Sequence, residues 1–182
     1  AKLTNGSMDI MMAVKSGKSI RFNEEKVRSM GRGSTGVRGI RLASEKDELV
    51  GMICVENAET EVLVVSENGY GKRSKVEDYR ITNRGGKGVK TINVTDKTGQ
   101  LIAIKNVQEG DDLMIINKSG IIIRMSVDDM RVMGRATQGV RLINLKEKDQ
   151  IAAVAKVEIS EEDESTDVSE STDVSESADV SE

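Results

Sequence analysis

The sequence lacks the residue types from which most metal sites and acid–base sites are built. It has no histidine, no tryptophan, no proline and one cysteine, Cys54. Zinc ligands are chiefly Cys and His, so no metal site is expected. Cys54 lies in the apolar run 49–55, which favours a core residue over a nucleophile. Because paired carboxylates, a nucleophile elbow and a phosphate-loop sequence are missing too, no catalytic residues are predicted.

Long apolar runs are also missing. No run approaches the roughly eighteen residues that span a bilayer, and the N-terminus lacks the charged-then-apolar pattern of a secretory signal. We therefore expect a cytoplasmic protein with no membrane partner. A length of 182 residues, of which 37% are hydrophobic, suits one ordinary domain or a short array of repeats.

The net charge conceals a split between two parts of the chain. The formal charge is −4, but residues 159–182 hold ten of the 31 acidic residues and none of the 27 basic ones, so residues 1–158 carry +6. Low hydrophobicity and dense negative charge predict a disordered acidic tail over 159–182. The cationic part suggests a polyanionic partner, and the tail either competes for its basic surface or only aids solubility.

Glycines mark three copies of one unit. Two glycines recur 19 residues apart in every copy, and the copies are offset by 52 and 51 residues. They are Gly17 and Gly36, Gly69 and Gly88, and Gly120 and Gly139. A period of about 50 residues is typical of propeller blades, which are small antiparallel sheets that bury their faces against neighbours. The predicted units are roughly 7–57, 58–109 and 110–158.

Each unit contains four short apolar or alternating runs. The first run leads through a glycine turn into the second, as in a hairpin. A polar connector, a glycine loop, an alternating third run and a charged loop precede the fourth. The first and fourth runs are 9–14 and 49–55, 61–65 and 101–107, and 112–116 and 151–157. We predict an all-β, propeller-like fold in which each unit forms one four-stranded antiparallel blade.

Basic residues keep the same place in every unit. They are Arg21, Arg73 and Arg124 in the second run, Arg28, Arg80 and Arg131 in the connector, Arg32, Arg84 and Arg135 in the glycine loop, and Arg38, Lys90 and Arg141 after it. The middle loop adds Gly85, Gly86 and Lys87. Glycines let a backbone approach a ligand closely, and cations favour phosphate. We therefore predict a DNA-binding surface made of Arg32, Arg38, Arg73, Arg84, Gly85, Gly86, Lys87, Lys90, Arg124, Arg135 and Arg141. An acid also recurs, at Glu25, Glu77 and Asp128, which leaves a structural role open for the first two basic positions.

The pattern favours duplex DNA over a single strand. Stacked units would repeat the cations around a curved rim, and phosphate contacts without a base-reading pattern suit a bent duplex. The aromatic residues are only Phe22, Tyr70 and Tyr79, and they do not occupy matching positions. The stacking platform that binds single strands is therefore missing.

Three motifs resemble a known family. Residues 30–42, with Met-Gly-Arg and Thr-Gly-Val-Arg-Gly-Ile-Arg-Leu, residues 68–73, Asn-Gly-Tyr-Gly-Lys-Arg, and residues 133–140, Met-Gly-Arg-Ala-Thr-Gln-Gly-Val, together resemble the last repeats of the C-terminal domain of the bacterial DNA gyrase A subunit. The resemblance covers residues 1 to about 157. It implies a β-pinwheel, usually of six blades, that wraps DNA and presents it for strand passage in ATP-dependent negative supercoiling.

The resemblance also implies partners. The B subunit, together with the rest of the A subunit, is expected in an A2B2 heterotetramer, with ATP and Mg²⁺ bound elsewhere and no cofactor in this chain. Three units resemble the C-terminal half of the domain. The family's Gln-Arg-Arg-Gly-Gly-Lys-Gly box is matched at 82–88 without its first two residues, so this loop is interpreted as a later blade's version. Two alternatives stay open: the C-terminal domain of the topoisomerase IV A subunit, and a propeller-type protein-interaction module.

Overall fold

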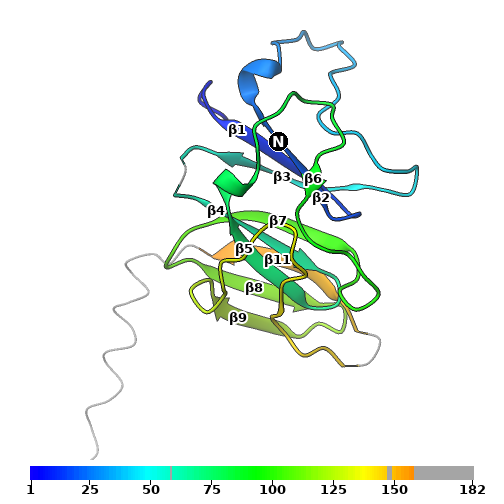
Figure 1. Cartoon of the computed structure of the whole chain (residues 1–182), viewed down its shortest axis with the longest axis vertical. Coiled ribbons are helices and arrows are strands. Elements are labelled where there is room, and N and C mark those ends of the chain that lie inside the picture. Colours follow the sequence, from blue (N-terminus) through cyan, green and yellow to red (C-terminus); the bar gives the residue numbers. More distant parts are fainter. Residues whose placement is uncertain (58, 147–148, 158–182) are drawn as a thin grey trace, which may run out of the picture.

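The part of the chain that the structure describes is made of short strands joined by turns and loops. The computed structural model describes residues 1–57, 59–146 and 149–157 (Figure 1), and the predicted acidic tail lies outside them. The elements are β1 (Asp9–Val14), β2 (Lys18–Asn23), the 3-10 turn η1 (Glu24–Lys26), β3 (Leu49–Val55), β4 (Glu61–Ser66), β5 (Tyr70–Lys75), the 3-10 turn η2 (Val76–Asp78), β6 (Val89–Lys90), β7 (Leu101–Val107), β8 (Asp112–Asn117), β9 (Ile122–Ser126), β10 (Val140–Arg141) and β11 (Ile151–Val157). No helix among the described residues is long and apolar enough to cross a membrane.

The strands form three antiparallel sheets that follow one another along the long axis of the molecule (Figure 1). Their strand orders are β3-β1-β2-β6, β10-β5-β4-β7 and β11-β8-β9. The predicted all-β, propeller-like class is confirmed. The first and fourth strands of each unit lie where the apolar runs predicted them, with β4 and β8 each one residue longer.

The third strand of a unit does not complete that unit's own blade, which corrects the sequence prediction. β6, from the second unit, pairs with β2 of the first, and β10, from the third unit, pairs with β5 of the second. Each exchanged strand has only two residues. The counterpart in the first unit, residues 37–38, forms no strand in the described structure.

Glycine in the loop makes this exchange possible. Gly88 has φ +70° and lies against the backbone of Ser19 in the neighbouring unit, so that a Cβ there would collide with the Ser19 carbonyl. Gly139 meets the Gly71 carbonyl in the same way, with φ +82°. Only glycine combines this backbone conformation with so close an approach. Contact between units therefore explains the loop glycine in the second and third units, whereas Gly36 shares only the positive φ, at +80°.

Two of the three buried clusters of the described residues lie between the sheets. Successive side chains of a strand point to opposite faces, so β4 sends Val62 and Val64 toward the first sheet and Leu63 and Val65 toward the third. All four side chains have 0% exposure. Consecutive apolar residues are thus needed because the strand is covered on both faces.

Candidate nucleic-acid interface

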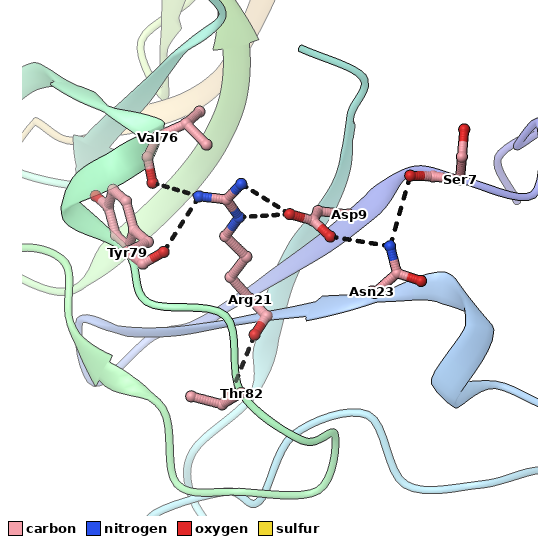
Figure 2. A network of polar contacts seen from close by, with 7 residues as sticks. All are labelled: Ser7, Asp9, Arg21, Asn23, Val76, Tyr79 and Thr82. Carbon is pink, nitrogen blue, oxygen red and sulfur yellow. Dashed lines mark hydrogen bonds and ion pairs between the residues drawn. The ribbon is translucent and has the colours of Figure 1, made fainter. Parts of the chain in front are cut away.

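The arginine of the second strand holds neighbouring units together. Figure 2 shows the Arg21 guanidinium between Asp9 of its own sheet and the η2 segment of the next unit. Its Nε and Nη2 lie 2.8 and 2.7 Å from one Asp9 carboxylate oxygen. Its Nη1 donates to the carbonyl oxygens of Val76, at 2.8 Å, and Tyr79, at 3.2 Å. Thr82 completes the contact by donating its N–H to the Arg21 carbonyl at 2.8 Å.

The equivalent Arg73 has the same role one unit further on. Its Nε donates to the Met130 carbonyl at 2.8 Å, and its Nη1 lies 3.1 Å from Glu61 and 3.9 Å from Asp128. The Arg73 side chain is 9% exposed. A guanidinium enclosed in this way has no free face for a phosphate, so we leave Arg73 out of the proposed DNA-binding set.

Arg124, the third member, has only half of these contacts. It lies 2.6 Å from Asp112, and its side chain is 55% exposed. Arg21 and Arg73 therefore have the structural role that the sequence left open for this position, whereas the Arg124 side chain remains accessible to a ligand.

The main acidic partners of these arginines were missed by the sequence analysis. They are Asp9, Glu61 and Asp112, all in the first strand of a unit. The recurring acid considered instead, at Glu25, Glu77 and Asp128, contributes only the longer Asp128 contact. The signal was present, because Asp9, Glu61 and Asp112 occupy one position in the gap-free alignment of the three units.

The middle glycine loop lies on the third run of the preceding unit. Arg84 donates from Nε to the Lys26 carbonyl at 2.9 Å and from Nη1 to the Arg38 carbonyl at 3.3 Å. The N–H of Gly85 donates to the Gly39 carbonyl, while the Gly86 carbonyl accepts from the backbone N–H of Arg41. The two glycines therefore fix the position of the loop.

Lys87 is the exposed cation of this middle loop. It lines a recess of 230 Å³ together with the exposed Arg80 of the connector. The loop therefore brings a Lys and an Arg from different segments to one open site, which is suited to a single anionic group.

The third loop repeats this arrangement. Arg135 donates from Nη1 to the Lys90 carbonyl at 3.0 Å. Two side chains of β5 also hold the loop: the Nζ of Lys72 donates to the Gly134 carbonyl, and the Ser74 hydroxyl donates to the Met133 carbonyl at 2.7 Å. Lys72 is fully buried, and burial lowers its pKa to about 8. The same position in the other units holds Ile20 and Ile123.

Two of the three loop arginines therefore reach the backbone of a residue in the preceding unit that carries another predicted cation. Arg84 bonds to Arg38, and Arg135 bonds to Lys90. Cations from adjacent units are brought together at the unit boundary, and of the predicted set the exposed side chains are Arg32, Arg38, Lys87, Lys90, Arg124 and Arg141, with Arg84 and Arg135 half-buried. We call these recurring cations of the three units the row of cations.

Arg141 ends this row beside an aromatic ring. Its Nη2 and Nε donate to the Tyr70 hydroxyl oxygen at 2.9 and 3.3 Å, and its guanidinium carbon lies 5.5 Å from the ring centroid. The hydrogen bond from Arg141 lowers the pKa of Tyr70. Tyr70 is 6% exposed, so it combines packing in the structure with this polar contact.

Stacked antiparallel sheets that exchange short strands, with recurring cations at the exchanged edge, define a propeller-type domain suited to a polyanion. Comparison with known proteins gives the family. The chain belongs to the DNA gyrase C-terminal domain, beta-propeller, family, whose model matches three times, at residues 9–56, 60–108 and 111–158.

Individual relatives agree with this assignment. The A subunit of DNA gyrase from Staphylococcus aureus strain NCTC 8325 / PS 47 is 48% identical over 167 residues, which are 91% of this chain and 19% of that protein. Its counterpart from strain MRSA252 is 47% identical over the same shares. The chain therefore spans about a fifth of the length of the curated relatives it matches.

Solved structures show the same fold. The DNA gyrase A C-terminal domain has a TM-score of 0.76 and 27% identity, over 84% of this chain and 52% of that one. The C-terminal domain of DNA topoisomerase IV has a TM-score of 0.80 and 22% identity, over 86% and 49%. At that identity the second likeness shows the fold alone.

Proposed function

We propose that this chain is a sequence-indifferent DNA-binding and wrapping module of the gyrase A protein. The observation that carries the proposal is the row of cations that crosses the unit boundaries, with Arg84 and Arg135 each bonded to the preceding unit's cation-bearing residue. Membership of the gyrase C-terminal domain family supports it. Because the recurring groups are cations suited to phosphate, the module would hold the backbone of a duplex whatever its sequence.

The wrapped duplex would be presented to the rest of a type II topoisomerase for strand passage. In this proposal the chain works in the cytoplasm within an A2B2 assembly of gyrase A and B subunits. ATP and Mg²⁺ act in other parts of that assembly, and this chain supplies no catalytic group. Its contribution is to bend and position DNA through contacts repeated once per blade.

The salt dependence of binding tests the proposal. Fluorescence anisotropy with a labelled random-sequence duplex should give a log K that falls linearly with log salt concentration, by about 0.9 for each phosphate neutralised. Replacing Arg32, Arg84, Arg135 and Lys87 together by Ala should flatten this line. A control that replaces Lys2 and Lys105, which line a groove between β3, β7 and β11, should leave it nearly unchanged. An unchanged slope in the fourfold variant would remove the loops from the interface.

Two other functions have distinct outcomes. A module of topoisomerase IV, whose C-terminal domain shares the fold with a TM-score of 0.80, would support relaxation or decatenation but no negative supercoiling in the assembled enzyme. A protein-interaction module would not shift linear duplex at low salt, even when the chain ends at Val157. Negative supercoiling by the assembled enzyme, lost in the fourfold variant, is the result expected for a gyrase module.

A further inference from the structure

We propose that a phosphate site separate from the glycine loops lies where β10 joins β5, and that Arg141, Lys97, Lys146 and the Tyr70 hydroxyl there hold one backbone phosphate of the bound duplex. This inference rests on the proposed function and names further residues of the same DNA path. Lys97, Lys146 and Tyr70 belong to none of the recurring cation positions.

The site is a pocket of 360 Å³ beside the β4–β5 hairpin turn. Its cations come from three separate segments: Lys97 precedes β7, Arg141 lies in β10, and Lys146 follows it. All three side chains are exposed. Cations that converge on one open pocket from different segments favour an anion there.

Tyr70 supplies a hydrogen-bond donor to this pocket. Its hydroxyl oxygen accepts from both Nε and Nη2 of Arg141. A phenol that accepts at its oxygen still has its own proton to donate. Among the described residues, the groups bonded to this hydroxyl are the Arg141 and Lys97 cations, which are donors only, so the proton has no acceptor there. A phosphate oxygen would be a suitable acceptor.

The positive charge of the pocket is not balanced within the described part of the chain. None of the ion pairs among the described residues involves Lys97, Arg141 or Lys146. Asp149 also lines the pocket and supplies one negative charge. Its oxygens accept from Asn117 and Ser119, at 2.6 and 2.8 Å, and from the backbone N–H of Gln150, so one carboxylate stands against three cations. An anion in the pocket would relieve the mutual repulsion of the three cations.

The ligand is a phosphate and not a stacked base. Lys97 Nζ and the Arg141 guanidinium lie 5.4 and 5.5 Å from the Tyr70 ring centroid. Tyr70 is 6% exposed, so its ring offers no free face to a base. Cations held in place on the ring and a hydroxyl donor suit a compact oxyanion.

The same junction one unit earlier also carries two cations on paired strands. Lys18 occupies the position of Tyr70, and it lies directly opposite Lys90, the counterpart of Arg141, in the β2–β6 pair. Like charges directly opposite on antiparallel strands are destabilising, unless an anion lies between them. Phosphate contacts at both junctions would extend the DNA path by one unit.

The test uses the full 182-residue chain with Lys97→Gln and Lys146→Gln combined. Both residues are exposed, so the variant should keep the circular dichroism spectrum of the parent. Anisotropy with the random-sequence duplex should show a several-fold loss of affinity and a salt slope smaller by about 0.9, the value for one phosphate contact. Tyr70→Phe should weaken binding while leaving the slope unchanged.

The matched control removes two charges elsewhere, with Lys2→Gln and Lys105→Gln. Lys105 lies in β7, at the opposite edge of the sheet from β10, so its loss should hardly change the slope. If the Lys97/Lys146 variant behaves like this control while the parent binds duplex, the pocket proposal is overturned and the proposed function stands.

Failure of the parent to bind duplex has a different consequence. That result would refute the proposed function. The pocket would then be tested by inorganic phosphate alone, through NMR signals of the Arg141 Nε–H and the Tyr70 ring. Saturable shifts that disappear in the Lys97/Lys146 variant would identify free phosphate as the source of the anion, and the absence of shifts would overturn the phosphate site.

Discussion

Arg21 and Arg124 occupy the same position in different units, so replacing each by Ala isolates the energy of contact between blades. Arg21 is bonded to Asp9 and to two carbonyls of the next unit, with its side chain 14% exposed. Arg124 keeps the carboxylate contact but is 55% exposed. The pair differs mainly in burial and in the contacts across the boundary.

The expected magnitudes are well separated. Arg21→Ala leaves Asp9 as a buried charge without its cation and leaves the Val76 and Tyr79 carbonyls without their donor. Removing one partner of a buried ion pair costs about 3–5 kcal/mol. Arg124→Ala breaks a pair in which the arginine is 55% exposed and Asp112 is 13% exposed. Because the arginine is open to solvent and no carbonyl loses a donor, its cost should be smaller, nearer to the value of about 0–1 kcal/mol for an exposed pair.

Urea unfolding followed by circular dichroism measures both effects. Because a domain is stabilised by only about 5–15 kcal/mol in total, Arg21→Ala should lower the unfolding midpoint strongly, and Arg124→Ala should shift it little. Arg21→Met combined with Asp9→Asn should recover part of the loss, since the unpaired charge is gone. Equal destabilisation by Arg21→Ala and Arg124→Ala would refute the role of this arginine as a link between units.

Two further predictions concern buried positions. Lys72 has a pKa of about 8 in the folded chain, below its ordinary 10.5. The unfolded chain therefore binds more protons between these two values, and the contribution of Lys72 to the unfolding free energy should rise with pH in that window. Urea unfolding at pH 7, 8, 9 and 10 should show the stability advantage of Lys72→Met shrinking as the pH rises, and a constant difference would contradict the burial argument. Gly88→Ala should destabilise the folded chain far more than Gly36→Ala, because both glycines have positive φ but only Gly88 of the two lies against another unit's backbone. Equal unfolding midpoints of the two variants would show that this contact is unimportant.

The sequence predicted the parts of the fold that depend on local pattern. β1, β3, β7 and β11 end at the expected residues because their apolar runs are bounded by charged or turn residues. The exchange of β6 and β10 between blades was missed because two-residue strands held by backbone bonds leave almost no side-chain pattern. Pairing within a unit and pairing between units require the same alternation.

The candidate interface was predictable in register but not in role. Arg73 and Arg124 share one sequence position, yet Arg73 is enclosed by the next unit and Arg124 is exposed. Burial by a neighbouring unit is a tertiary property that the alignment of repeats cannot supply. Lys97 and Lys146 were missed for the complementary reason, since neither occupies a position that is basic in all three units and only folding brings them to Arg141.

The most direct test of the central claim, that this chain wraps duplex DNA, is the topology of DNA closed in its presence. A nicked circular plasmid is sealed by ligase with increasing amounts of the full chain, freed of protein and resolved on a gel. We expect the distribution of topoisomers to shift progressively, whatever the plasmid sequence, and the fourfold loop variant to shift it less. A distribution that stays centred on the protein-free value while anisotropy shows saturated binding would contradict wrapping.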